Sequence, residues 1–259
     1  MIRTTALLVL AVAVCPAQTA DTKLAEAYWE WERTVPPSPS EDEAYRRYKA
    51  KLKADGLSAA AIEDTIVRIK REGLRQEGEF YDSIYTKGPR INFGPNALLV
   101  EAVKNRKPGK ALDVAMGQGR NAIFLAQQGW DVAGFDISRV GLQQARAKAE
   151  AAGLKINTVL AADTDFDFGV AKWDLIAVIY ALEKRSARKV RDALKPGGIA
   201  VIESGHRKGP GVPFEYEGTE LRDIFKGFRI LKYEQITAKG DWSDGEKPYP
   251  LVRIIALKP

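Results

Sequence analysis

The feature that most constrains the fold is an alternation, beginning at Lys110, of short apolar runs with longer helical stretches. In order, these runs and stretches occupy residues 111–115, 121–128, 131–135, 140–152, 156–161, 174–180, 188–194 and 199–202. Strands separated by helices predict βαβ units and a parallel sheet, in which ligands bind at the carboxyl ends of the strands. We therefore expect an α/β domain whose site lies at the strand ends.

The first predicted strand ends in a glycine loop, Asp113-Val-Ala-Met-Gly-Gln-Gly-Arg-Asn121. Gly117 and Gly119 allow a tight turn and a close approach to a ligand because they lack a Cβ atom. The helix that follows offers free N–H groups to an anionic group. Asp113, inside the strand, can hold the loop by accepting hydrogen bonds from backbone N–H groups. By itself the loop also fits a dinucleotide-binding fingerprint, Gly117-x-Gly119-x-x-Ala122.

Two further strand ends carry acidic residues. Asp136 ends the second strand, where its carboxylate can accept hydrogen bonds from both hydroxyls of a ribose. Such charge-assisted bonds contribute about 1.5–3 kcal/mol each. Asp163 and Thr164 follow the third strand, where a carboxylate can bind the amino group of an adenine. An aspartate at a strand end can equally cap a turn or a helix, so these residues alone leave both interpretations open.

Taken together, the ordered motifs resemble the class I S-adenosylmethionine-dependent methyltransferases, in particular the tellurite-resistance and thiopurine types that act on small molecules. The motifs that carry the resemblance are Lys107-Pro-Gly-Lys-Ala-Leu-Asp113, Gly117-Gln-Gly-Arg-Asn121, Gly134-Phe-Asp-Ile-Ser138, Leu194-Lys-Pro-Gly-Gly198, Glu220-Leu-Arg-Asp-Ile-Phe225 and Leu251-Val-Arg-Ile-Ile-Ala-Leu-Lys-Pro259. They cover the chain from about Asn92 to Pro259. The resemblance implies a Rossmann-like fold: a seven-stranded, mostly parallel sheet with helices on both faces and a C-terminal antiparallel hairpin at about 229–237 and 251–257.

The resemblance also implies the cofactor S-adenosyl-L-methionine and transfer of its methyl group to a small-molecule acceptor by in-line displacement. The residues that it assigns to cofactor binding are Asp113, Ala115, Met116, Gly117, Gly119, Asn121, Asp136, Ile137, Ala162, Asp163, Thr164 and Ile179. Family members usually carry glycine where this chain has Ala115, and an alanine held at positive φ costs about 1–2 kcal/mol. The stretch 239–247 lacks a histidine that many relatives have. If that histidine handles an acceptor in those relatives, we expect this chain to handle a different acceptor or none.

Three side chains are candidates for catalytic roles. His206, just past the fifth strand, can act as a base near neutral pH. Tyr180 and Arg185 follow the fourth strand and can line the acceptor pocket, where an arginine would suit an anionic acceptor. An ordinary surface position explains each of them equally well. Because the chain has one Cys and one His, we expect neither a disulfide nor a metal site.

Residues 1–20 have the layout of a secretory signal peptide, with one arginine, an apolar run from Ala6 to Val14 and a small residue, Ala17, near the expected cut. The apolar run is shorter than a membrane-spanning helix requires. The leader predicts a periplasmic or secreted protein without a stable membrane span after cleavage. S-adenosylmethionine is a cytoplasmic metabolite, however, so a cytoplasmic location stays open as the alternative.

Between the leader and the core, residues 21–80 form a predicted helical extension, and the methyltransferase-like domain takes up residues 81–259. Ile62, Ile66 and Ile69 recur at helical spacing on one face of this extension. Its position predicts a lid, and Tyr85, Arg90 and Asn92, which follow it, are candidates to cover the cofactor.

Two other functions fit parts of the sequence. The glycine loop would serve an NAD(P)-dependent oxidoreductase, although that function leaves Asp113 and the Lys195-Pro-Gly-Gly198 turn unexplained. The leader would suit an exported, non-enzymatic binding module built on a methyltransferase fold. The net charge of +6 is scattered, so we predict no nucleic-acid partner, and the identity of the acceptor and the oligomeric state are left open.

Overall fold

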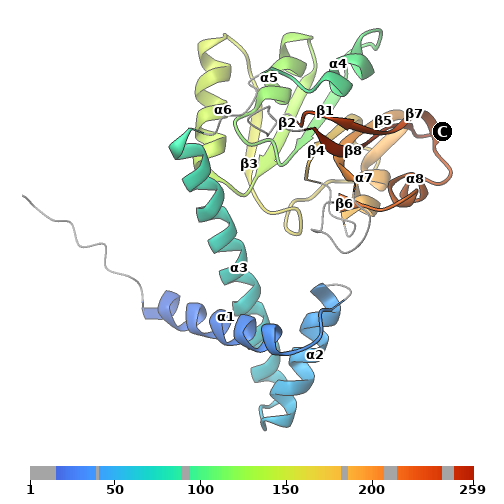
Figure 1. Ribbon diagram of the computed structural model, residues 1–259. Helices are drawn as coiled ribbons and strands as arrows, with labels where there is room; N and C mark the ends of the chain where they lie inside the picture. The colour runs from blue at the N-terminus through green and yellow to red at the C-terminus, as the bar shows by residue number, and fades with distance from the viewer. Residues whose placement is uncertain (1–15, 39–40, 89–93, 182–185, 207–214, 241–247) are drawn as a thin grey trace, which may run out of the picture. The chain divides into compact units, whose positions relative to one another are not determined.

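The computed structural model describes residues 16–38, 41–88, 94–181, 186–206, 215–240 and 248–259 (Figure 1). The chain divides into two compact units, residues 1–77 and residues 78–259. The division falls close to the predicted start of the methyltransferase-like domain. The predicted leader lies mostly outside the described residues, and the first turn of helix α1 (Pro16–Thr34) covers its end.

The first unit is helical, built from α1, α2 (Glu41–Ala54) and the larger part of α3 (Ala59–Lys87). Acidic residues in the first turn of α2 and lysines in its last turn complement the helix dipole. The core of the unit combines two groups of buried side chains. They are the rings of Tyr28, Tyr45 and Tyr48 and the predicted apolar stripe of Ile62, Ile66 and Ile69. Near the start of α1, Asp21 forms ion pairs with Arg68 and Arg71 of α3.

The second unit contains one mixed sheet in the order β3-β2-β1-β4-β5-β8-β7, and the short strand β6 also pairs with β5. The strands are β1 (Lys110–Val114), β2 (Asp131–Asp136), β3 (Asn157–Leu160), β4 (Trp173–Ile179), β5 (Leu194–His206), β6 (Glu215–Tyr216), β7 (Arg229–Ala238) and β8 (Tyr249–Leu257). Strands β1 to β5 run parallel, whereas β8 is antiparallel to both β5 and β7. The predicted C-terminal hairpin is therefore confirmed.

Helices cover both faces of this sheet, as Figure 1 shows. They are α4 (Ala97–Val103), α5 (Arg120–Gln127), α6 (Arg139–Ala151), α7 (Ala187–Ala193) and α8 (Glu220–Ile224). Alternate residues of the central strands belong to opposite cores: Leu175 packs in the core with α4, α5 and α6, whereas Ile176 packs in the core with α7 and α8. Burial on both faces explains why the strands read as continuous apolar runs.

The strand order determines where a ligand can bind. Strand β1 lies between β2 and β4, so the chain leaves β1 toward one side of the sheet and continues on the other side after β3. A crevice forms at such a switch point, outside the carboxyl ends of the strands. In the described part of the chain, no helix is long and apolar enough to cross a membrane.

Candidate cofactor-binding site

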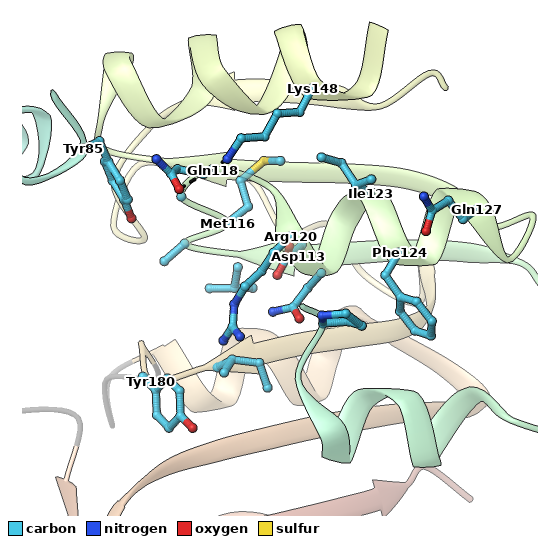
Figure 2. Close-up of a pocket in the computed structure, with 16 residues that line it drawn as sticks. Tyr85, Asp113, Met116, Gln118, Arg120, Ile123, Phe124, Gln127, Lys148 and Tyr180 are labelled. Carbon is cyan, nitrogen blue, oxygen red and sulfur yellow. Dashed lines mark hydrogen bonds between the residues drawn. The ribbon is translucent and has the colours of Figure 1, made fainter. Parts of the chain in front are cut away.

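A pocket of about 460 Å³ opens at the carboxyl ends of β1 and β4, within the usual size range of small-molecule sites (Figure 2). Several residues predicted for the site line it: Asp113, Ala115, Met116, Gly117, Asn121, Ile179 and Tyr180. Other predicted residues lie outside this lining: Gly119, Asp136, Ile137, Ala162, Asp163 and Thr164. The glycine loop thus forms one wall of the pocket, and the end of β4 forms the other.

Two buried aspartates hold the glycine loop. Asp113 accepts a hydrogen bond from the backbone N–H of Ala122 at 3.0 Å. Asp136 accepts one from the N–H of Gly117 at 2.8 Å and a second from the N–H of Ser138 at 2.7 Å. Burial raises the pKa of the Asp113 carboxyl to about 7, with the Arg120 charge opposing the rise. Burial also raises the pKa of the Asp136 carboxyl.

The loop turns through left-handed backbone conformations, with φ of 50° at Ala115, 52° at Gly117 and 77° at Gly119. A Cβ atom on Gly117 would overlap the hydroxyl of Tyr85, and one on Gly119 would lie 2.8 Å from the Cβ of Ala145. Glycine is therefore required at 117 and 119 by both conformation and space. Ala115 is in the strained conformation anticipated from the sequence, at a cost of about 1–2 kcal/mol.

The last turns of α3, which belong to the second unit, cover the turn between β2 and α6. Asp82 accepts hydrogen bonds from the Ser138 hydroxyl at 2.5 Å and from the N–H of Val140 at 3.0 Å. The side-chain amide of Gln144 donates to the backbone oxygen of Tyr85 at 3.2 Å. Burial, with the nearby Asp136 carboxylate, raises the pKa of Tyr85. This cover explains why Asp136 is only 5% exposed and lies beneath the pocket wall.

The wall at the ends of β4 and β5 is organised by Glu203, a residue that sequence analysis missed. Its carboxylate is 1% exposed and accepts hydrogen bonds from the Tyr180 hydroxyl and, at 3.0 Å, from the side chain of Asn96. Arg253 on β8 forms an ion pair with its other oxygen. Tyr180 itself is in the left-handed region, with φ of 63°. The only sequence signal was a glutamate directly following an apolar run.

The end of the third strand is braced against α7. The Asp163 carboxylate accepts a hydrogen bond from the Ser186 hydroxyl, and Lys189 donates to the backbone oxygens of Asp163 at 2.8 Å and of Thr164 at 3.1 Å. Ala162 is buried beside them. The predicted adenine-binding residues therefore form one rigid corner next to, but not lining, the pocket.

The remaining candidates are placed only in part. The backbone of His206 ends β5 and pairs with Tyr216 of β6. Arg185 lies outside the described residues, as do Arg90 and Asn92. Their predicted roles stay predictions.

Two basic side chains line the pocket. Arg120 donates to the backbone oxygen of Gly94 at 3.1 Å, and Figure 2 shows its side chain extending toward Tyr180. Lys148 donates to the side-chain oxygen of Gln118 at 3.3 Å, and burial lowers the pKa of its ammonium group. Asp113 is the single acidic residue of the lining. Among the described residues, no group of His, Cys, Asp and Glu could hold a metal ion.

Comparison with known proteins identifies the domain. Residues 111–198 match the family described as "Methyltransferase domain". Hemagglutinin 1 of Eikenella corrodens is 28% identical over 176 residues, which are 61% of this chain and 58% of that protein. The probable S-adenosyl-L-methionine-dependent methyltransferase TehB of Haemophilus influenzae is 25% identical over 154 residues, 53% of this chain and 52% of TehB. The chain thus spans little more than half the length of these relatives.

The crystal structure of TehB from Haemophilus influenzae superposes with a TM-score of 0.55 at 21% identity, covering 63% of this chain and 62% of that one. This likeness shows the same fold. The family match over residues 111–198 and the likeness to TehB support the predicted class, the class I S-adenosylmethionine-dependent methyltransferases. Within that class the domain is similar to TehB, and S-adenosyl-L-methionine is the cofactor that this class implies.

Proposed function

We propose that this chain binds S-adenosyl-L-methionine in the pocket at β1 and β4 and transfers its methyl group to a small-molecule acceptor. The observation that carries the proposal is the glycine loop at the pocket, in which Gly117 and Gly119 take left-handed backbone conformations while Asp113 and Asp136 hold the backbone. The pocket volume of about 460 Å³ suits a nucleoside joined to an amino acid.

In this proposal the two sides of the pocket have different tasks. The loop around Gly117 approaches the methionyl part, and Asp136 binds the ribose through lone pairs that its two backbone partners leave available. The adenine would lie toward the corner formed by Ile137, Ala162, Asp163 and Thr164. For the ribose to reach Asp136, the end of α3 around Tyr85 would have to shift, which extends the predicted lid role to these turns.

The bound cofactor supplies a methyl group activated by its sulfonium centre. The protein then has to align the acceptor with that methyl group and exclude water, as positioning contributes most of what the chain can add. Ile179 and Tyr180 would form the wall where the cofactor meets the acceptor, with His206 and Arg185 as further candidates on the acceptor side. Arg120 and Lys148 favour an anionic acceptor, because two basic residues and one buried aspartate leave the lining net positive.

Calorimetry with the full chain tests the proposal. We expect S-adenosylmethionine and S-adenosylhomocysteine to bind in the micromolar range or tighter and NADH not to bind. Mass spectrometry of a panel of anionic thiols, carboxylates and heterocycles, incubated with labelled cofactor, would then identify the acceptor. Binding of NADH without binding of S-adenosylhomocysteine would overturn the proposal in favour of an oxidoreductase.

A second candidate is an exported binding module that uses the fold without catalysis. It is favoured by one observation, the relative named Hemagglutinin 1, together with the predicted leader. A chain that agglutinates cells or binds their surface while failing to bind S-adenosylhomocysteine would support it.

We also propose that the chain is exported after removal of residues 1–20. Cell fractionation with amino-terminal sequencing tests this, and we expect a periplasmic or secreted protein that begins near Asp21. A cytoplasmic protein that retains Met1 would overturn the proposal.

A further inference from the structure

Glu203 is a buried carboxylate for which the proposed cofactor contacts have no use. It lies on β5 directly opposite Ile179 of β4 and Arg253 of β8 in the strand register. Its side chain is 1% exposed and is not part of the pocket lining. A buried charge persists only when hydrogen bonds and an opposite charge compensate its lost hydration. The hydrogen-bond and ion-pair partners of Glu203 therefore indicate the role of its carboxylate.

One partner is Tyr180, and Glu203 holds it at both ends. The backbone N–H of Tyr180 donates to the backbone oxygen of Glu203 at 2.7 Å, and the phenol hydroxyl donates to the carboxylate. Between these two points the backbone has φ of 63°, a conformation that a tyrosine adopts only when its surroundings impose it. Tyr180 and Ile179 both line the pocket, and Figure 2 shows Tyr180 at its edge. The carboxylate thus fixes the direction of an aromatic wall.

A second partner connects the same carboxylate to the opposite side of the pocket. The side chain of Asn96 donates to Glu203 at 3.0 Å, while its oxygen caps α4 through the N–H groups of Leu98 and Leu99. The backbone N–H of Asn96 donates to the side chain of Asn121 on α5 at 2.9 Å. Pro95 and Asn121 both line the pocket. Two walls that come from distant parts of the sequence are therefore joined through one buried acid.

We propose that Glu203 is a positioning residue: it fixes Tyr180 and the Pro95–Asn96 segment as one preformed wall, and thereby sets the affinity of the pocket for its nucleoside ligand. Arg253, on the side away from Tyr180, balances the charge. Preorganisation of this kind increases affinity because the bound protein has less conformational freedom left to lose. The role rests on the proposed function, because it takes the pocket as the cofactor site.

The test is a set of dissociation constants for S-adenosylhomocysteine, measured by calorimetry on the full chain. Tyr180→Phe keeps the ring and removes the hydroxyl, and Glu203→Met keeps the volume and removes the carboxylate. We expect each single variant to bind about tenfold more weakly. The double variant should also bind about tenfold more weakly, because both changes break the same Tyr180–Glu203 hydrogen bond. Glu203→Gln should bind within about threefold of wild type, because its amide oxygen can still accept from Tyr180 and Asn96, while its NH2 group would face Arg253 and lower stability.

A matched control separates positioning from general stability. Asp174→Asn changes a carboxylate on the neighbouring strand β4, at the end away from Ile179, which accepts hydrogen bonds from the backbone N–H of Lys110 and the ammonium group of Lys195. We expect it to lower the melting temperature without changing the dissociation constant. If Glu203→Met does not fold, the double-variant cycle uses Asn96→Ser, which removes another hydrogen bond of the Glu203 carboxylate, against Tyr180→Phe.

The outcomes separate a failure of the proposed function from a failure of the positioning role. If the wild-type chain does not bind S-adenosylhomocysteine, the proposed function fails and the positioning role fails with it. If the wild type binds but Tyr180→Phe has no effect, or the two losses multiply to about a hundredfold in the double variant, only the positioning role is overturned.

Discussion

The two walls of the pocket use buried carboxylates in opposite ways. On the β1–β2 side, Asp113 and Asp136 accept hydrogen bonds from backbone N–H groups that lie at most 19 residues away in the sequence. On the β4–β5 side, Glu203 is held by side chains that are 23, 50 and 107 residues away. The first wall is held by hydrogen bonds between residues that are near each other in the sequence. The second forms only when four separate segments have come together.

This difference predicts how each wall responds to mutation. A backbone N–H cannot be removed by substituting its residue, except by proline, so the first wall is sensitive mainly at the acids and glycines themselves. Each side-chain partner of Glu203, in contrast, can be deleted and would leave a buried charge less satisfied. The predictions below probe the contrast in order of decreasing expected effect.

The largest effect is expected for Asp113→Asn on the pH dependence of stability. The pKa of Asp113 is raised by burial from 3.8 to about 7. Between these values the folded chain keeps a proton that the unfolded chain has released, so the free energy of unfolding falls as the pH rises toward 7. Asparagine stays neutral and can still accept from Ala122. It should therefore be more stable than wild type at pH 8, by up to about 4 kcal/mol, and similar at pH 4.

Urea unfolding at pH 4, 6 and 8 measures this difference. Asp131→Asn, at the exposed start of β2, serves as the control and should follow the wild type at every pH. Because burial also raises the pKa of Asp136, some pH dependence will persist in the variant. Parallel curves for Asp113→Asn and wild type would contradict the prediction.

The next effect probes the second wall through Asn96→Ala. This change removes the cap of α4, which contributes about 1 kcal/mol, and takes one hydrogen bond from the buried Glu203, which costs about 1–3 kcal/mol. We expect the free energy of unfolding to fall by about 3 kcal/mol in total. Asn96→Asp keeps the cap but places a second carboxylate against Glu203. An Asn96→Asp variant that is as stable as wild type would show that the side chains at positions 96 and 203 are not in contact.

Asp136→Asn is expected to weaken binding of S-adenosylhomocysteine by about ten- to a hundredfold, because one charge-assisted hydrogen bond of 1.5–3 kcal/mol is lost. Calorimetry measures the change, and Asp131→Asn on the same strand is again the control. Equal affinity in both variants would mean that the ribose lies away from the end of β2.

The smallest effect is expected for Ala115→Gly, which relieves a positive φ within the first wall. After allowance for the greater freedom of glycine in the unfolded chain, the gain should be about 0.5–1 kcal/mol. Ala171 is also at positive φ, 45°, but lies outside the pocket lining, so Ala171→Gly is a matched control. Both should raise the melting temperature, while only Ala115→Gly should alter ligand affinity. A loss of stability in both would contradict the strain argument.

The same contrast explains what the sequence could predict. The strand order, the hairpin and the place of the glycine loop follow from periodicity, turn residues and family motifs that lie within short stretches, and the structure confirms this fold. The arrangement of Asp113 and Asp136 around the loop is equally local. Asn96 and Arg253 could not be recognised in this way, because each becomes meaningful only beside Glu203, which the fold brings to them from elsewhere in the chain.

The place of Tyr85 was anticipated only loosely. Its position ahead of the core suggested a covering role, but the hydrogen bonds of Asp82 with Ser138 and Val140 depend on α3 continuing to Lys87, beyond the predicted extension. Propensity does not determine such helix ends, since tertiary contacts extend or shorten them. The hydrogen bond between Asp163 and Ser186 was not predicted either, because Ser186 lies on a different βα connection.

The position of β8 has a consequence for how the protein is made. Among the described strands β8 is the last to be synthesised, yet it lies between β5 and β7 and brings Arg253 to Glu203. Until β8 is made, β5 lacks its long antiparallel partner, and Glu203 has no Arg253 beside it. The glycine loop, by comparison, can form as soon as β1 and β2 have paired. A nascent chain that has not reached Tyr249 is therefore expected to carry half of a ligand site, and ligand capture would report that β8 has been added to the sheet.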